Sequence, residues 1–282
     1  MPFIDCDVAR IAYDAVGCGP AVVLLHSTAS SSAQWTTTRA ALSGRFAMAA
    51  VDLYGYGASD PWPGHRAITL ADEADAVARV ASRFRAPVHL VGHSYGGAVA
   101  LKLALMGCPL ASLTLIEPVS LHLLRGERDT GLLREVQGLA DAVTSAVRRG
   151  RPAVGLALFV DYWNGPGSWD GMGPERRDAV CRVADAVVRN FAAALDEPAR
   201  LADCAALDVP TLLLAGGRSP RPTAHIAARL AATIPGADHR IVGEAGHMLP
   251  RTHPDAFLAE LQRHLDRNPL GWEAAARLPS GT

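Results

Sequence analysis

The chain of 282 residues is long enough to bury a sizeable hydrophobic core, and it can form one large domain or a domain that carries an insertion. The formal net charge is -1 and 20% of the residues are charged, with lysine and arginine dispersed along the chain, so a nucleic-acid partner is not expected. The five cysteines are widely spaced and include no CxxC pair, which indicates reduced thiols rather than a disulfide framework or a zinc site.

The first residues, MPFIDCDVARIAYDAVG, contain acidic side chains where a signal peptide needs a basic stretch followed by an apolar one. No run of the sequence approaches the about 18 apolar residues that a membrane-spanning helix needs. We therefore expect a soluble, cytoplasmic protein with no membrane partner. The alternation of apolar and polar residues in this segment also predicts an antiparallel pair of strands at the edge of a sheet.

Short runs rich in β-branched and apolar residues recur along the chain. Continuous apolar runs of this length are typical of strands that are covered on both faces, as in a parallel sheet. The runs are residues 21–26, 46–53, 87–93, 112–117, 210–217 and 238–247. Segments of helical length and period lie between most of them, for example residues 70–84 and 98–107. This alternation predicts an α/β fold with a doubly wound, mostly parallel sheet.

One interval, residues 119–207, breaks this alternation because it contains no convincing strand. Within it, residues 131–147 and 178–191 each place apolar side chains on one face of a helix. The segment FVDYWNGPGSWDGMGP lies between them and is rich in glycine, proline and aromatic residues, a composition typical of turns and exposed rings. The interval therefore reads as a helical insertion between two strands.

These patterns predict a division of the chain into a core and a cap. Residues 1–118 form the first part of the core, residues 119–207 form a helical cap that reaches over the sheet, and residues 208–282 complete the core. The periodic pattern ends after Leu265, so we expect the last residues to form a loosely docked tail.

The stretch LVGHSYGGAVAL contains a GxSxG pattern around Ser94. The five residues alone are a weak signal, because 26 glycines make chance matches frequent and a glycine-rich packing corner has the same composition. The pattern follows a predicted strand and precedes a predicted helix, however, as in a nucleophile elbow, where a strained turn exposes the serine hydroxyl. The N-terminus of that helix also favours developing negative charge. We therefore predict that Ser94 is a nucleophile.

A serine hydroxyl is a weak nucleophile and needs a general base. His247 directly follows the last predicted strand, in a loop at the carboxyl edge of the sheet that can bring it to Ser94. The other nine histidines are less well placed. His89 lies inside a strand, and His93 lies in the elbow itself, where we expect it to pack or hydrogen-bond near the site. His247 is therefore the predicted base.

Four motifs, taken in chain order, resemble those of the α/β-hydrolase fold superfamily in its serine-nucleophile branch. They are LLHSTASSSAQW, DLYGYGASD, GHSYGG and GHMLPRTHPDAF, and together they span nearly the whole chain outside the predicted cap. The resemblance implies an enzyme with a catalytic triad and an oxyanion hole. It does not define the substrate, because this fold supports many chemistries.

The sequence departs from the family pattern at the acid of the triad. In most members this acid follows the strand that corresponds to PTLLLAGG, but the stretch GGRSPRP has no carboxylate. Some members place the acid after the strand that follows the elbow helix, and Glu117 ends that strand here. We therefore expect Glu117 to orient His247. The alternatives are that Glu117 caps the first helix of the cap or pairs with an arginine such as Arg218.

The loop after the first parallel strand also departs from the pattern, since His26 and Ser27 stand where the family usually has His-Gly. The resemblance implies that two backbone N–H groups hold the oxyanion, one after His26 and one after the nucleophile. These groups belong to Ser27 and Tyr95. His26 lies beside this loop and is a candidate substrate-binding residue.

The resemblance implies hydrolysis of a carboxylic ester or a lactone of a small molecule, through an acyl-enzyme intermediate on Ser94. A serine at the elbow argues against dehalogenase and epoxide-hydrolase activity, because those members use an aspartate. The alternatives are a C–C bond hydrolase of a diketone-type substrate and a non-hydrolytic binding or biosynthetic accessory protein.

Trp163 and Trp169 are candidate substrate-binding residues, although they equally fit a small core within the cap. No metal or organic cofactor is implied, and the oligomeric state stays open.

Overall fold

The computed structural model describes residues 1–84, 87–125 and 131–270. Most of the predicted C-terminal tail, residues 271–282, lies outside the described residues. Within the described part of the chain, no helix is both long enough and apolar enough to cross a membrane.

A central sheet is formed by strands that match the predicted apolar runs, preceded by the predicted N-terminal pair. The strands are β1 (Phe3–Asp5), β2 (Arg10–Val16), β3 (Ala21–Leu25), β4 (Ala47–Val51), β5 (Val88–His93), β6 (Leu110–Ile116), β7 (Thr211–Gly216) and β8 (Asp238–Val242). They pair in the order β1-β2-β4-β3-β5-β6-β7-β8. β1 and β2 pair antiparallel with each other, and β2 pairs antiparallel with β4. All the other pairs are parallel, so the predicted mostly parallel sheet is confirmed.

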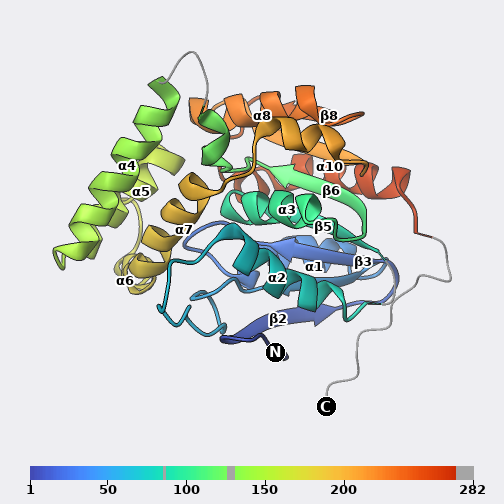
Figure 1. Ribbon diagram of the computed structural model, residues 1–282, viewed down its shortest axis with the longest axis horizontal. Helices are drawn as coiled ribbons and strands as arrows, with labels where there is room; N and C mark the ends of the chain where they lie inside the picture. The colour runs from blue at the N-terminus through green and yellow to red at the C-terminus, as the bar shows by residue number, and fades with distance from the viewer. Residues whose placement is uncertain (85–86, 126–130, 271–282) are drawn as a thin grey trace.

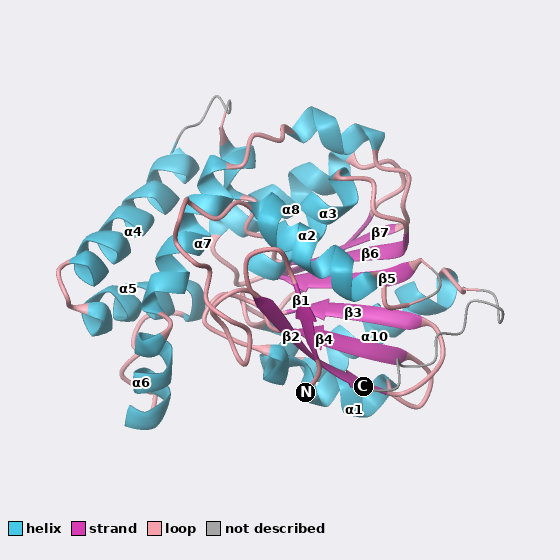
Figure 2. Ribbon diagram, turned by 60° about the horizontal axis from the view of Figure 1, so that its bottom comes forward, coloured by secondary structure: helices cyan, strands magenta, loops and turns pink. Residues whose placement is uncertain are grey.

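Helices cover both faces of the sheet (Figure 2). One face carries α2 (Leu70–Ala81), α3 (Tyr95–Leu105) and α8 (Arg221–Thr233), and the other carries α1 (Thr36–Leu42) and α10 (Pro254–Arg267). Side chains of β3 show why its sequence is apolar throughout: Val23 packs in one hydrophobic core and Val22 in the other, and both are fully buried. A doubly covered strand has no solvent face, so it needs no polar residues.

The chain between β6 and β7 forms helices only, as far as it is described. These are α4 (Gly131–Arg148), α5 (Pro152–Asn164), α6 (Pro174–Arg182) and α7 (Ala184–Asp196), with 3-10 turns at Leu121–Leu124 and Leu201–Ala206. They lie together beside the end of the sheet (Figure 1). The absence of a strand in the described part of this interval agrees with the sequence pattern, whereas its division from the core as a cap stays a prediction.

Two details of this interval differ from the sequence-based expectation. The predicted helix over 178–191 is two helices, because the chain turns at Val183 between α6 and α7. The segment expected to form turns with exposed rings begins as the last part of α5, which ends only where Gly165 takes a φ of 101°. The glycines and prolines that signal turns start at that residue, and the aromatic residues before them follow the helical period.

Candidate active site

Ser94 occupies the turn between β5 and α3 with φ 59° and ψ -116°, a backbone conformation that is unfavourable for residues other than glycine. The Ser94 N–H donates to Ile116 O at 2.9 Å, and this bond ties the turn to the end of β6. A Cβ atom at Gly92 would lie 2.2 Å from Gly96 O. The glycines of the motif therefore allow β5 and α3 to approach closely, and the strained turn presents the serine at the carboxyl edge of the sheet.

The structure brings Ser94, His247 and Glu117 together although they come from three different loops. Ser94 Oγ lies 2.9 Å from His247 Nε2, and His247 Nδ1 lies 3.3 Å from Glu117 Oε2. The three side chains are buried. With the Nδ1 proton directed at the carboxylate, Nε2 can accept a hydrogen bond from the Ser94 hydroxyl. This is the relay that a serine nucleophile needs.

Glu117 is held by donors on its second oxygen as well. Its Oε1 accepts hydrogen bonds from the Gly216 N–H at 2.5 Å and from Ser219 Oγ at 2.6 Å. Burial raises the pKa of the Glu117 carboxyl, but the hydrogen bond and charge of His247 and the donors Ser219 and Gly216 together lower it below its ordinary value. Arg218, the alternative partner, pairs with Glu244 instead. Glu117 is therefore a carboxylate directed at the histidine.

His247 is supported by His93, which the sequence placed near the site. The Nε2–H of His93 donates to His247 O at 2.8 Å, and its Nδ1 accepts from Gln34 Nε2 at 3.0 Å. Burial lowers the pKa of His93 to about 3, so the ring stays neutral next to His247. The ring of Trp163 also packs against the His247 ring, with ring centroids 4.5 Å apart. The imidazole is thus fixed by contacts on several sides.

The predicted oxyanion hole needs one correction. The Tyr95 N–H, at the first position of α3, donates to no acceptor within the described residues and is available to an oxyanion. The Ser27 N–H, in contrast, already donates to Gln34 Oε1 at 3.1 Å, as does Ser27 Oγ at 2.8 Å. The next residue, Thr28, lines a cavity together with Ser94, and the described part of the chain offers its N–H no acceptor. Thr28 therefore replaces Ser27 as the second candidate donor.

His26, a predicted substrate-binding residue, lies away from the cavities that open at Ser94. Its ring is fully buried, with Nδ1 donating to Ser27 O at 2.7 Å and Nε2 accepting from the Leu53 N–H at 3.1 Å. Burial lowers the pKa of His26, so the ring is neutral and can accept at Nε2. It lines neither of the cavities that open at Ser94. The side chain braces the oxyanion loop against the turn after β4 and does not face the substrate.

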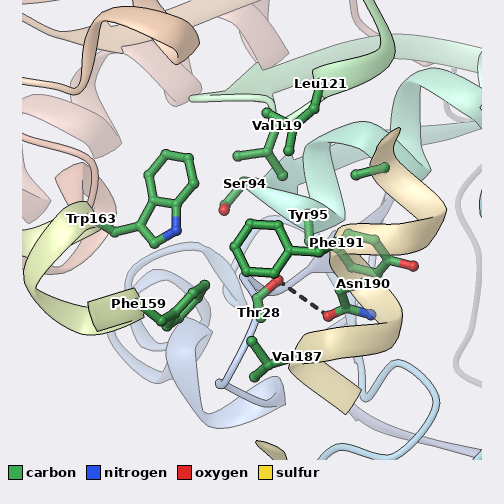
Figure 3. Close-up of a pocket in the computed structure, with 11 residues that line it drawn as sticks. Thr28, Ser94, Tyr95, Val119, Leu121, Phe159, Trp163, Val187, Asn190 and Phe191 are labelled. Carbon is green, nitrogen blue, oxygen red and sulfur yellow. Dashed lines mark hydrogen bonds between the residues drawn. The ribbon is translucent and has the colours of Figure 1, made fainter. Parts of the chain in front are cut away.

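Two cavities meet at Ser94. The first, which we call the apolar pocket, has about 290 Å³ of space. Figure 3 shows the Ser94 hydroxyl pointing into it. Its walls are Thr28, Ser94, Tyr95, Val119, Leu121, Phe159, Trp163, Val187, Asn190, Phe191 and Ala194. The second, which we call the entrance pocket, has about 520 Å³. Its walls are Ser27, Thr28, Ala29, Ser30, Ser94, Phe159, Val160, Trp163, Asn164, Met172, Arg176, Val180, His247, Met248 and Arg251.

The two tryptophans of the helical interval have different positions. Trp163 lines both cavities and contacts His247, as expected for a residue that can meet a substrate. Trp169 lines neither cavity: it is 8% exposed and packs in the hydrophobic core, with its backbone N–H donating to Asp161 Oδ1 at 2.7 Å. The structure therefore places Trp169 in the core and not at either cavity that opens at Ser94, which favours the alternative of a core position for this residue.

Two polar residues near the site were not recognised from the sequence. Gln34 joins the oxyanion loop to His93, and Asn190 of α7 accepts hydrogen bonds at Oδ1 from Thr28 Oγ1 at 3.2 Å and Tyr56 OH at 2.6 Å. Gln34 lies inside the motif LLHSTASSSAQW and Asn190 lies outside the four motifs, but no sequence pattern indicates what either side chain contacts. Among the residues that the structure describes, no cluster of three or more His, Cys, Asp or Glu side chains could hold a metal ion.

The sheet order, the elbow and the residues gathered at its edge define the class of protein. Residues 22–260 match the alpha/beta hydrolase family, and the chain belongs to that family.

Individual relatives extend this finding. A putative carbamate hydrolase of Pantoea ananatis is 28% identical over 271 residues, covering 93% of this chain and 91% of the relative. A pimeloyl-[acyl-carrier protein] methyl ester esterase of Nitrosomonas europaea is 37% identical over 98 residues, 35% of this chain and 36% of the relative. An uncharacterized protein of Mycobacterium tuberculosis is 36% identical over 96 residues, 34% of this chain, and this match spans only 28% of the relative.

Solved structures share the fold. An α/β hydrolase from Sphaerobacter thermophilus is 24% identical, with a TM-score of 0.74 over 93% of this chain and 99% of that one.

Proposed function

We propose that the protein is a serine hydrolase that cleaves a carboxylic ester or a lactone of a small molecule through an acyl-enzyme intermediate. The observation that carries this proposal is the 2.9 Å contact from Ser94 Oγ to His247 Nε2, in a buried relay that ends at Glu117. The names of two relatives support it, since a carbamate hydrolase and a methyl ester esterase both act on a carbonyl carbon that bears a leaving group.

Acylation follows from the geometry. Ser94 Oγ attacks the carbonyl carbon while its proton passes to His247 Nε2, and Glu117 stabilises the positive charge of the imidazolium from the Nδ1 side. The N–H groups of Tyr95 and Thr28 bind the oxygen as it becomes negative. The C–O bond then breaks, and the alkoxide leaving group takes the proton from His247 Nε2.

Deacylation uses the same groups in the same order. A water molecule gives its proton to His247 Nε2 as its oxygen attacks the acyl carbon, and the second oxyanion is bound by the same two N–H groups. Ser94 leaves as the alkoxide and recovers its proton from His247. The acid product then departs, so the enzyme returns to its starting state.

Residues 119–207 act in this proposal as a cap that shapes the substrate cavity. The support is that α5 supplies Phe159 and Trp163 and α7 supplies Val187 and Phe191 to the apolar pocket. These side chains surround the Ser94 hydroxyl (Figure 3). The pocket therefore favours a compact apolar group on one side of the scissile bond.

Hydrolysis of short-chain p-nitrophenyl esters and of small lactones by the purified protein tests the proposal. We expect turnover by the wild type and a fall in kcat of at least about a thousandfold in Ser94→Ala. Ser43→Ala, which removes a hydroxyl after α1, is the matched control and keeps wild-type rates. Wild-type turnover in Ser94→Ala would contradict the mechanism. Cleavage of a vinylogous diketone but of no ester would favour the C–C hydrolase alternative.

A further inference from the structure

The entrance pocket contains two arginines that the proposed mechanism does not use. Arg176 lies on α6 and Arg251 lies on α9 (Leu249–Thr252), the short helix that follows His247. Both line the same cavity as Ser94 and His247. Segments far apart in the sequence thus bring two arginines to one cavity that opens at Ser94.

Neither arginine has a counter-ion in the part of the chain that the structure describes. Other arginines are paired, for example Arg10 with Asp60 and Arg66 with Asp72. No ion pair or side-chain hydrogen bond joins Arg176 or Arg251 to a described residue, and no carboxylate is among the described residues that line the entrance pocket. Among the described residues, the lining of this cavity therefore has two positively charged side chains and no negatively charged one.

The two guanidinium groups also interact unfavourably with each other. Partial burial and then the charge of Arg176 lower the pKa of Arg251 below its ordinary value. Repulsion between like charges costs free energy, and an anion bound between two guanidinium groups that line one cavity offsets that cost. The arrangement is the one expected of a site that is completed by a negatively charged ligand.

We propose that Arg176 and Arg251 bind an anionic group of the substrate, a carboxylate or a phosphate, while the ester carbonyl lies at Ser94. Guanidinium groups bind either anion through paired hydrogen bonds. The apolar pocket also opens at Ser94, and neither arginine lines it. The substrate class is therefore an ester with a compact apolar group on one side of the scissile bond and an anionic group on the other. This inference rests on the proposed hydrolase function.

The test uses pairs of esters that differ only in charge. Monoesters of dicarboxylic acids and acyl esters of hydroxyalkyl phosphates are each compared with a neutral analogue of equal length, a carboxamide or a methyl sulfone. For one charged series we expect the wild type to show at least a tenfold higher kcat/KM than for its neutral partner. The series that shows this preference identifies the anion. Equal kcat/KM for charged and neutral esters in both series overturns the proposal.

Variants connect the preference to the two arginines. In Arg176→Gln and in Arg251→Gln, the ratio of kcat/KM for charged over neutral ester should fall about tenfold, mainly through KM. Arg182→Gln removes the same charge from the exposed end of α6, outside the entrance pocket, and should leave the ratio unchanged. A ratio that falls in Arg182→Gln as much as in the pocket variants would indicate a diffuse charge effect and contradict the site.

Binding measurements separate this inference from the hydrolase function. In Ser94→Ala, calorimetry should show about tenfold tighter binding of the preferred charged ester than of its neutral analogue, and Arg251→Gln added to that variant should abolish the difference. Cleavage of esters without any charge preference would support the hydrolase function and contradict the proposed anion subsite. Charge-dependent binding in a protein that cleaves no ester would support the anion subsite and contradict the proposed hydrolase function.

Discussion

The Ser219 hydroxyl donates a hydrogen bond to Glu117 Oε1 at 2.6 Å, so the loop that lacks a carboxylate takes part in holding the acid. Glu117 follows β6 and Ser219 follows β7, and these strands are neighbours with Ile116 paired to Leu214. Because parallel neighbours end at the same edge, an acid after β6 lies close to the place of an acid after β7. This relationship explains how His247 obtains a carboxylate partner from the earlier strand.

Glu117→Gln tests the role of that carboxylate. The amide keeps the shape of the side chain but cannot stabilise a protonated His247, so we expect kcat for p-nitrophenyl esters to fall by about a thousandfold or more. Circular dichroism should show an intact fold. Glu260→Gln, which removes a carboxylate from the exposed pair with Arg263, is the control and keeps its rate. A kcat for Glu117→Gln within a factor of a few of the wild type would show that Glu117 has a structural role only.

Ser219→Ala tests whether the loop after β7 positions the acid. Gly216 still donates to Glu117 Oε1, so the carboxylate stays in place but is less restrained. Losing one hydrogen bond to a charged group predicts a fall in kcat of about tenfold with little change in KM. Ser219→Thr keeps the hydroxyl and should recover most of the rate. An equal loss in the alanine and threonine variants would show that the effect comes from packing.

Trp163→Phe and Trp169→Phe form a matched pair. Trp163 lines both cavities, so its truncation enlarges the space at Ser94 and should raise kcat/KM for longer acyl chains relative to acetate by about fivefold to tenfold. Trp169 packs in the core away from both cavities, so its truncation should lower the free energy of unfolding by about 1–3 kcal/mol without changing the chain-length preference. A changed preference in Trp169→Phe, or none in Trp163→Phe, would contradict these positions.

Glu73, on α2, is fully buried, and burial raises its pKa to about 8. The folded protein then binds this proton more tightly than the unfolded chain, where the carboxyl titrates near 4.5. Protonation of Glu73 therefore contributes fully to the free energy of unfolding below the unfolded pKa of 4.5. This contribution decreases as the pH rises above that value and is lost once the pH has passed the folded pKa of about 8. Glutamine does not ionise, so the stability of Glu73→Gln relative to the wild type should increase by about 4 kcal/mol between pH 5 and pH 9.

Urea unfolding of both proteins at several pH values measures this difference. The control is Glu260→Gln, because its carboxylate is at the surface and should change the pH profile little. Parallel pH profiles for the wild type and Glu73→Gln would show that Glu73 is ionised in the folded protein at neutral pH, against the stated prediction.

The parts of the fold that could be predicted are those in which burial shapes the sequence directly. β3 is apolar throughout because both faces of the sheet are covered, and the elbow can be recognised because Gly92 and Gly96 are needed for close approach of strand and helix. Glu117 could be named because it ends a strand next to the elbow. In each case a local pattern reflects a local physical constraint.

The parts that could not be predicted depend on directions of side chains and on distant segments. His26 and Ser27 lie beside the site in sequence, but the ring of His26 turns to the Leu53 N–H and the Ser27 N–H turns to Gln34. Arg176 and Arg251 are ordinary polar residues until α6 and α9 meet at one cavity. No periodicity or motif carries this information, because it arises only when the helices pack.

The central claim is that Ser94 forms a covalent intermediate with the help of His247. Labelling with a fluorophosphonate, followed by peptide mass spectrometry, tests it most directly, because the reagent bonds only to an activated serine. We predict one label per chain on the peptide that contains Ser94, no label in Ser94→Ala and labelling at least about a hundredfold slower in His247→Ala. A folded wild-type protein that takes up no label, or that is labelled equally fast without His247, would contradict the account.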